Sequence, residues 1–370
     1  MKKILILVFS VALLFSCGDN DSAGDTSNNF DRTAILTNWA DNIIIPSYTN
    51  YQTKVNILNN SIIDFSANPT EANLLLVRNN WKAAYLAYQY VAIYNVGKAE
   101  EISFKDCTNA YPTDISGINA NIQTNSYNLE LLSQYTKQGF PALDYMINGL
   151  ASTDASIVNF YVIDSNAANY KQYLTAISLR LKTNANAIVT DWNTSYRAAF
   201  IANNGTSVSS SVNRVTNNFV KNFEKDVRSG KVGIPAGIFS SGTLFPDKTE
   251  AYFTAGFSKE LLTASIQASK DFFNGKDFNS TLTGSSLKSY LDDVNAVRND
   301  QKLSDIINNQ YATIFTTNSP LNDNLSIQVS NDNSKMITTY DALQQNVVYL
   351  KLDMMQALNI TIDYVDGDGD

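Results

Sequence analysis

The chain has 370 residues, and 44% of them are hydrophobic, which is enough to bury the core of one large domain or of two ordinary ones. Its net charge of −8 argues against nucleic acid as a partner. It has no histidine, which excludes a Ser-His-Asp triad, a Cys-His nucleophile pair and a histidine-ligated zinc. A metal site would need carboxylates and carbonyls, which suit calcium, magnesium or manganese, or iron bound through oxygen.

Residues 1–16 have the pattern of a bacterial signal peptide. Lys2 and Lys3 precede an apolar run over residues 4–15, which is too short to span a bilayer. The segment Leu14-Phe15-Ser16-Cys17 resembles the lipobox of bacterial lipoproteins, which implies cleavage before Cys17 and a lipid on its thiol. An ordinary secretory signal with a coincidental cysteine is the alternative. We therefore expect a cell-envelope protein with a lipid anchor in the outer membrane, on the periplasmic face or at the cell surface. Cys107 would then lack a disulfide partner and be a buried thiol.

Apolar residues at spacings of three and four predict helices along the rest of the chain. Residues 17–29, rich in Gly, Asp, Ser and Asn, predict a flexible tether before the first helix. Pro46 lies within that helix or kinks it, and residues 97–127 are expected to be mostly connection. Later helices are predicted at residues 168–192, 209–229, 249–274, 285–296, 302–316 and 335–359. The fold class expected is all-α.

A predicted long helix, from the turn at residues 68–71 to about residue 95, carries a charge in its apolar stripe. Arg78 lies between Leu74 and Trp81 at helical spacing. A guanidinium in such a place needs a carboxylate or carbonyl oxygens. We expect Asp144 to be its partner; the alternative is that Arg78 extends to solvent at the edge of the stripe.

Residues 138–149 predict a short helix with both ends marked. Pro141 suits its first position, and Gly149 suits a left-handed C-terminal stop. Its apolar face consists of Leu143, Met146, Ile147 and Leu150. Asp144 lies beside this face in the first turn, where the helix dipole favours a negative charge. It is therefore either a binding carboxylate or merely a partner of the dipole.

Three further segments carry weaker patterns, two of which have an alternative interpretation. The glycines of residues 230–246 predict a loop, with or without an anion-binding nest of backbone N–H groups. Residues 360–365 alternate like a short strand. The tail at residues 366–370 has alternating aspartates, which favour a solvated acidic end over a calcium loop because the distal glutamate is missing.

Four stretches, in this order and behind a lipobox, resemble the imelysin family of bacterial envelope proteins in the form seen in Bacteroidetes. They are Arg78-Asn79-Asn80-Trp81-Lys82-Ala83-Ala84, Gly139-Phe140-Pro141-Ala142-Leu143-Asp144-Tyr145, Gly230-Lys231-Val232-Gly233-Ile234-Pro235-Ala236-Gly237, and Lys351-Leu352-Asp353-Met354 with the acidic tail. The resemblance implies an imelysin-like domain over residues 30–365. It would have two helical-bundle halves, at about 30–190 and 191–365, and a functional cleft between them.

The family hallmark is Gly-x-His-x-x-Glu, once proposed as a metallopeptidase signature. The matching positions here are Gly139, Pro141 and Asp144, so proline replaces the histidine and aspartate replaces the glutamate. Because proline has no ligating atom, the peptidase metal site is not available at this position. Members of the family are linked to iron or haem uptake, and the resemblance implies such a role without requiring a cofactor.

We expect a non-enzymatic lipoprotein that binds a small ligand or an envelope protein partner at the cleft, in iron or haem acquisition. The residues expected to line or support this site are Arg78, Trp81, Tyr85, Gly139, Phe140, Pro141 and Asp144. Two alternatives are a metallopeptidase-like hydrolase that works without histidine and a surface glycan-binding lipoprotein, since the chain has 20 Tyr and 18 Phe.

Overall fold

A computed structural model of the chain describes residues 30–364. The predicted signal peptide, Cys17, the tether and the acidic tail lie outside these residues. The described chain is helical, as predicted, with a small antiparallel hairpin of β1 (Val297–Arg298) and β2 (Gln301–Lys302), in which Val297 pairs with Lys302. Within residues 30–364, none of the helices is both long and apolar enough to cross a bilayer.

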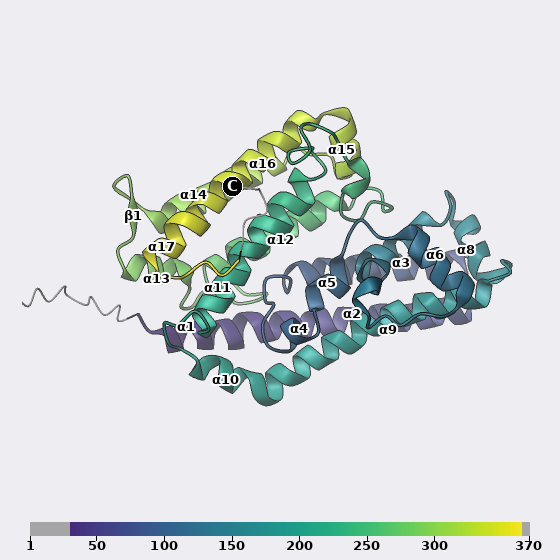
Figure 1. Ribbon diagram of the computed structural model, residues 1–370, viewed down its shortest axis with the longest axis horizontal. Coiled ribbons are helices and arrows are strands. Elements are labelled where there is room, and N and C mark those ends of the chain that lie inside the picture. Colours follow the sequence, from purple (N-terminus) through teal and green to yellow (C-terminus); the bar gives the residue numbers. More distant parts are fainter. Residues whose placement is uncertain (1–29, 365–370) are drawn as a thin grey trace, which may run out of the picture.

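The first half of the molecule comprises the elements from α1 to α10. Its long helices α2 (Ile45–Ala67), α3 (Glu71–Gln89) and α9 (Ala167–Asp191) form a bundle in which α2 packs against both others (Figure 1). The shorter elements are α1 (Arg32–Asn38), η1 (Trp39–Ile44), α4 (Lys98–Glu101), α5 (Phe104–Asn109), α6 (Ile115–Thr124), η2 (Leu132–Lys137), α7 (Gly139–Asp144), η3 (Tyr145–Gly149), α8 (Asp154–Val162), η4 (Trp192–Tyr196) and α10 (Arg197–Ala202).

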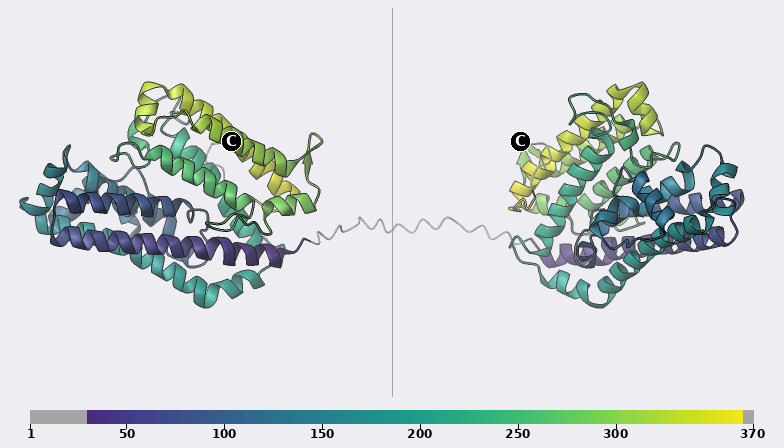
Figure 2. Two further views of the ribbon diagram at one scale, coloured as in Figure 1. Left: turned by 180° about the vertical axis from the view of Figure 1, so that it is seen from behind. Right: turned by 45° about the vertical axis from the view of Figure 1, so that its right-hand side comes forward.

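The second half comprises the elements from α11 to α17. The π-helical η5 (Asn222–Gly233) continues α11 (Ser211–Lys221) and packs against α12 (Ser258–Phe273) and α16 (Asn333–Val347). The remaining helical elements are η6 (Pro246–Lys248), α13 (Leu287–Asp293), α14 (Leu303–Asn318), α15 (Leu325–Asn331), η7 (Val348–Met354) and α17 (Met355–Ala357). The two halves pack through α3 and α12, which Figure 2 shows next to each other from behind. The predicted architecture of two packed helical halves is confirmed.

Pro46 creates a second link between the halves. As the second residue of α2, it has no N–H to donate to the Asn42 carbonyl four residues earlier. That carbonyl instead accepts a hydrogen bond of 2.8 Å from the backbone N–H of Phe278, in the loop after α12. The Asn38 amide adds a bond of 3.1 Å to the Ser285 carbonyl of the same loop. Pro46 thus lies within a continuous helical run, one of the two predicted outcomes, and the π-helical η1 ends two residues before it.

Some predicted element boundaries are wrong. Residues 97–127 carry three short helices, α4 to α6, rather than mostly connection. The helix predicted at residues 249–274 begins only at Ser258, because Ala251 (φ +54°) and Gly256 (φ +72°) have left-handed backbones.

Two further predictions are wrong in the second half of the molecule. The helix predicted to end at residue 229 continues to Gly233. Residues 360–364 form no strand; the Asn217 side chain contacts the Thr361 carbonyl and the Asp363 N–H instead.

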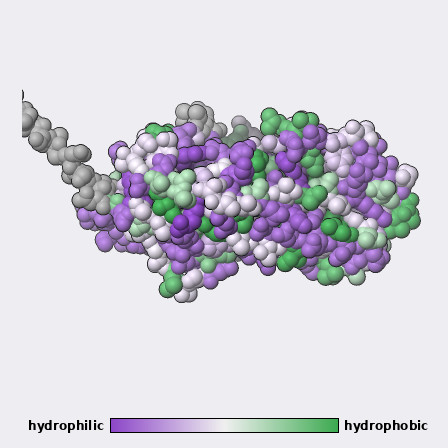
Figure 3. Space-filling model, turned by 90° about the horizontal axis from the view of Figure 1, so that it is seen from below, coloured by the Kyte–Doolittle hydropathy of each residue, from purple (hydrophilic) through white to green (hydrophobic). Residues whose placement is uncertain are grey.

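The aromatic side chains are mostly internal. Among residues 30–364, the large exposed hydrophobic side chains are aliphatic except for Phe239 and Tyr252. On the face shown in Figure 3, hydrophobic atoms form small patches among hydrophilic ones. This distribution gives the glycan-binding alternative no exposed aromatic platform on the described surface. Cys107 is a free, buried thiol, as predicted.

Candidate functional site between the two halves

The segment predicted to be central forms α7 and the π-helical turn η3. Pro141 is the third residue of α7 rather than the first, because the helix starts at Gly139. Gly139 has a φ of +77°, and a Cβ atom there would lie 2.2 Å from the Thr108 carbonyl oxygen. Gly149 is not the predicted left-handed stop. It ends η3, and its missing Cβ leaves room for the ring of Phe253.

The predicted ion pair between Arg78 and Asp144 is wrong. Arg78 donates to the Asp154 carboxylate at 2.7 Å, and its Nε and Nη2 donate to the Ile147 carbonyl at 3.0 and 2.9 Å. Asp154 lies in the first turn of α8, which packs against α3. Arg78 therefore joins α3 to η3 and α8, and it does not contact the carboxylate of α7.

The aromatic residues predicted for the site meet in the core. Trp81 donates from its indole N–H to the Phe140 carbonyl at 3.1 Å. The rings of Tyr85 and Phe140 stack, with centroids 4.5 Å apart and planes 8° apart. All three side chains are fully buried. They support the backbone of α7, and Trp81 also lines, with Arg78, a separate pocket of about 290 Å³.

Asp144 is buried and contacts the second half of the molecule. Its Oδ2 accepts from the Phe253 N–H at 2.9 Å, and its Oδ1 accepts from the Asn148 amide at 2.9 Å and from the Thr254 hydroxyl. Burial raises the pKa of this carboxyl to about 6, although the hydrogen bonds act in the opposite direction. Asp144 and Pro141 line a small pocket of about 290 Å³. Asp144 thus faces a cavity, as predicted, but its oxygens are already occupied by protein donors.

The residues at the hallmark positions do not fit a bound metal ion. Pro141 has no ligating atom where the family has histidine, and both oxygens of Asp144 accept hydrogen bonds from the protein. Among residues 30–364, no three Asp, Glu or Cys side chains are grouped closely enough to bind one ion. The described residues therefore contain no set of side chains that could bind the metal ion of a peptidase.

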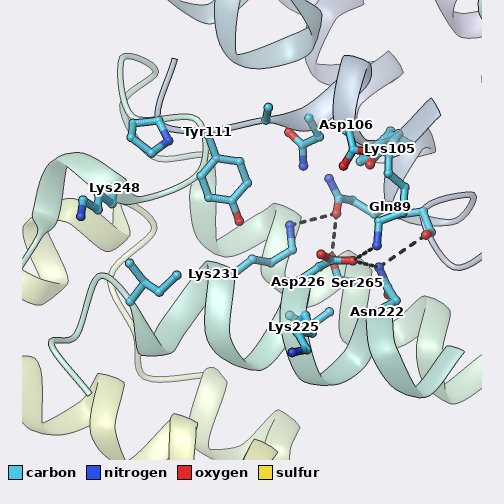
Figure 4. Close-up of a pocket in the computed structure, with 18 residues that line it drawn as sticks. Gln89, Lys105, Asp106, Tyr111, Asn222, Lys225, Asp226, Lys231, Lys248 and Ser265 are labelled. Carbon is cyan, nitrogen blue, oxygen red and sulfur yellow. Dashed lines mark hydrogen bonds and ion pairs between the residues drawn. The ribbon is translucent and has the colours of Figure 1, made fainter. Parts of the chain in front are cut away.

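A larger pocket lies between the halves, and we call it the inter-half pocket. Its volume is about 480 Å³. The first half contributes residues of α3, α5 and the turn after α5, and the second half contributes residues of η5, η6 and α12 (Figure 4). Its charged lining residues are Lys105, Asp106, Lys225, Asp226, Lys231 and Lys248. Lysines therefore outnumber aspartates in its lining, although the whole chain is acidic.

A buried polar network forms the inner wall of the inter-half pocket. The Lys231 ammonium donates to the Glu250 carboxylate and, at 3.0 Å, to the side-chain oxygen of Gln89 in the first half. Glu250 also accepts from the Asn109 amide at 2.8 Å, and Asn109 accepts from the Tyr85 hydroxyl. Lys231 and Glu250 are almost completely buried. Their opposite charges offset part of the desolvation cost of burying each of them.

The turn segment at residues 249–254 connects this wall to α7. Glu250 belongs to the network of the inter-half pocket, whereas Phe253 and Thr254 contact Asp144. The two pockets also share Tyr111 and Pro112 in their linings. Between Glu250 and Phe253, Ala251 has a left-handed backbone, which is uncommon for a residue with a side chain. The two cavities are therefore neighbours built on one segment.

Sequence reasoning missed most of this pocket. Of the residues expected at the site, Tyr85 reaches the network through Asn109, and none of the seven lines the inter-half pocket. The glycine-containing stretch from residue 230 onward was a usable indication, because Gly230 and Lys231 lie in the pocket wall. Nothing local in the sequence marked Gln89, Asn109 or Glu250.

Comparison with known proteins supports the same architecture. The family model for imelysin (Peptidase M75) matches residues 44–352. A protein from Synechococcus elongatus called iron-regulated protein A is 22% identical over 266 residues, which are 68% of this chain and 65% of that protein. The match thus covers less than two thirds of the relative's own length.

Two solved structures have the same fold. One is described as an iron-regulated protein A precursor from Parabacteroides distasonis; it has a TM-score of 0.72 at 15% identity, over 89% of this chain and 95% of that one. The other is an imelysin-like protein from Psychrobacter arcticum, with a TM-score of 0.69 at 19% identity, over 90% of this chain and 97% of that one. Because the family model covers most of the sequence, the chain belongs to the imelysin family.

Proposed function

We propose that this protein is a non-enzymatic binding protein of the cell envelope, whose small ligand occupies the inter-half pocket. The observation that carries the proposal is the pocket itself. Its walls come from both halves, and its volume of about 480 Å³ is within the range of small-molecule sites. Its inner wall is a buried hydrogen-bonded network around Lys231 and Glu250 that includes side chains of both halves.

A role in iron physiology is the second part of the proposal. It is supported by the names of two similar proteins, which describe them as iron-regulated. The altered hallmark favours binding of an iron-containing or iron-linked molecule over ligation of a bare ion by α7. The lipobox-like segment ending at Cys17 favours an outer-membrane lipid anchor.

The binding proposal can be tested with a variant that fills the pocket. Ala110 lines the pocket at the end of α5, is partly exposed and has an ordinary extended backbone. The full-length protein and Ala110→Trp would be purified from cell envelopes and compared by native mass spectrometry. We expect a small-molecule adduct on the wild type that is absent from Ala110→Trp, with equal melting temperatures. The same adducts on both proteins, or none on either, would contradict the proposal.

Anchoring and iron dependence have separate tests. Metabolic labelling with a palmitate analogue is expected to label the wild-type chain and to leave Cys17→Ser unlabelled. Cellular levels of the protein are expected to rise several-fold when an iron chelator is added to the medium. Equal labelling of both chains would refute the anchor, and unchanged levels would refute the link to iron.

A further inference from the structure

The inter-half pocket contains hydrogen-bond donors that the protein leaves unused. An ammonium group has three hydrogens, and Lys231 uses two of them on Glu250 and Gln89. The third has no acceptor among residues 30–364. Because Lys231 is only 3% exposed, solvent can satisfy this hydrogen only through the pocket.

A second unused donor is the Tyr111 hydroxyl. This hydroxyl oxygen lies next to Gly230, 3.2 Å from the position that a Cβ atom on Gly230 would take. It makes no hydrogen bond with any residue of the described chain. In Figure 4 this hydroxyl points into the same space as the Lys231 ammonium. Burial and the nearby Glu250 charge raise the pKa of Tyr111 well above its ordinary value. It therefore remains a neutral O–H donor.

A third donor is the Lys248 ammonium. It lies 3.8 Å above the centre of the Phe245 ring and forms no ion pair with any described residue. Lys105 lines the pocket on another side and keeps further ammonium hydrogens beyond its ion pair with Asp226. Figure 4 shows Lys248 and Lys105 on opposite sides of the view, with Lys231 and Tyr111 between them. Donors thus surround the space from several elements.

Two of the three acidic groups around the pocket are already engaged by protein donors, and the third, Asp106, is exposed to solvent. Asp226 accepts from Lys105 and from the Asn222 amide, and Glu250 accepts from Lys231 and Asn109. A cationic ligand would have to displace these partners from Asp226 or Glu250, or bind through Asp106 alone in a pocket lined by four lysines. An anionic ligand could instead accept from the unused donors while every existing bond is kept.

We propose that the ligand of the inter-half pocket is a small oxyanion with at least two negative charges, either a polycarboxylate or a phosphate compound. Lys231 and Tyr111 contact one acidic group, and Lys248 contacts another. This inference rests on the proposed function, because it requires that the pocket binds a ligand. An iron chelate formed by a polycarboxylate belongs to this class, and the protein would recognise its outer oxygens rather than the metal.

The test is isothermal titration calorimetry at low ionic strength with citrate, inorganic phosphate, uncharged triethyl citrate and the diamine putrescine. Citrate or phosphate is expected to bind, more weakly as salt is added, and the uncharged ester and the diamine are not. Tighter binding of citrate than of phosphate would assign the ligand to the polycarboxylates, and the reverse order would assign it to the phosphates.

Lys248→Gln is the diagnostic variant, because it removes one partly exposed charge. It is expected to weaken binding of the preferred anion about tenfold, the loss of one charge-assisted hydrogen bond. Lys270→Gln is the matched control. Lys270 also lies over an aromatic ring, that of Phe315, and does not line the pocket. It is expected to bind as tightly as the wild type.

Three results would overturn the inference. They are equal binding of triethyl citrate, equal affinity of Lys248→Gln and wild type, and no heat from citrate or phosphate at millimolar concentration. If a neutral or cationic compound binds the wild type but not Ala110→Trp, the anion inference fails and the binding function stands. If envelope-purified protein shows no adduct that depends on Ala110, the binding function itself fails.

Discussion

Two residues of α7 have different roles: Gly139 acts through its backbone conformation, and Asp144 acts through the hydrogen bonds of its side chain. Gly139 allows the helix to begin against the backbone of α5. Asp144 uses its carboxylate to bind the turn at residues 249–254. The sequence predicted the buried face of this segment, but it could not predict that Asp144 contacts Thr254 rather than Arg78. The two are 110 residues apart, and no local spacing relates them.

Asp144 is expected to make stability depend on pH. Its pKa of about 6 in the folded protein exceeds the value of about 3.9 in an unfolded chain, so the folded state binds more protons between these values. Stability should therefore fall as the pH rises from about 4 to about 6, by about 3 kcal/mol from this group. Asp144→Asn cannot ionise and should lose this component. Urea unfolding of both proteins from pH 4 to 7 measures the difference, with the exposed Asp247→Asn as control. A constant difference across this range would contradict the expectation.

Gly139→Ala is expected to destabilise the fold by about 2 kcal/mol or more, because it combines a left-handed backbone with a clash against the Thr108 carbonyl. Gly205→Ala is the matched control, since no atom lies within 4 Å of its Cβ position. Thermal unfolding should lower the melting temperature of the first variant only. Equal melting temperatures would show that the start of α7 can shift.

At the scale of elements, apolar spacing predicted the long helices and failed for the short ones. Helices such as α2, α3 and α9 bury a stripe along their whole length, so their period is visible in the sequence. The helices α4 to α6 have four to ten residues, too few for a clear period. The start of α12 was misplaced because left-handed backbone at Ala251 and Gly256 follows from tertiary contacts rather than from composition.

The turn at residues 249–254 is expected to depend on one hydroxyl. Thr254→Val keeps the side-chain shape but removes the hydrogen bond to Asp144 and the one accepted from Asn148, and the loss of the bond to Asp144 should cost about 1.5–3 kcal/mol at pH 7. The cost should shrink near pH 4, where the carboxyl is protonated. Chemical unfolding at both pH values measures it. Thr53→Val, which loses only an exposed bond to the Thr49 carbonyl, is the control. An equal loss of stability in both variants would show that the hydrogen bond to Asp144 does not stabilise the turn.

At the scale of the whole molecule, the halves meet around the buried pair of Lys231 and Glu250. Its members lie 19 residues apart, and Gln89, which contacts the same ammonium, lies 142 residues away from Lys231. The resemblance to a family predicted two halves and a cleft, which is correct. Most of the residues that form the cleft could not be predicted, because they come from five separate stretches whose proximity only the fold creates.

The buried pair is expected to behave as a coupled unit. Lys231→Met or Glu250→Gln alone should destabilise the protein by about 3–5 kcal/mol, since each leaves an uncompensated buried charge. The double variant should be markedly more stable than the sum of the two losses predicts. Denaturant unfolding of the four proteins gives the coupling energy. The same cycle on the exposed pair Lys98 and Glu101 should give less than about 1 kcal/mol. Additive losses at Lys231 and Glu250 would contradict the pairing.

The hydrogen bond between the Asn42 carbonyl and the Phe278 N–H determines which substitutions the contact between the two halves can tolerate. Both atoms belong to the main chain, so exchange of either side chain leaves the bond available. Only proline at position 278 would abolish the donor outright. The packing of the first half against the second is therefore insensitive, at this contact, to most side-chain substitutions.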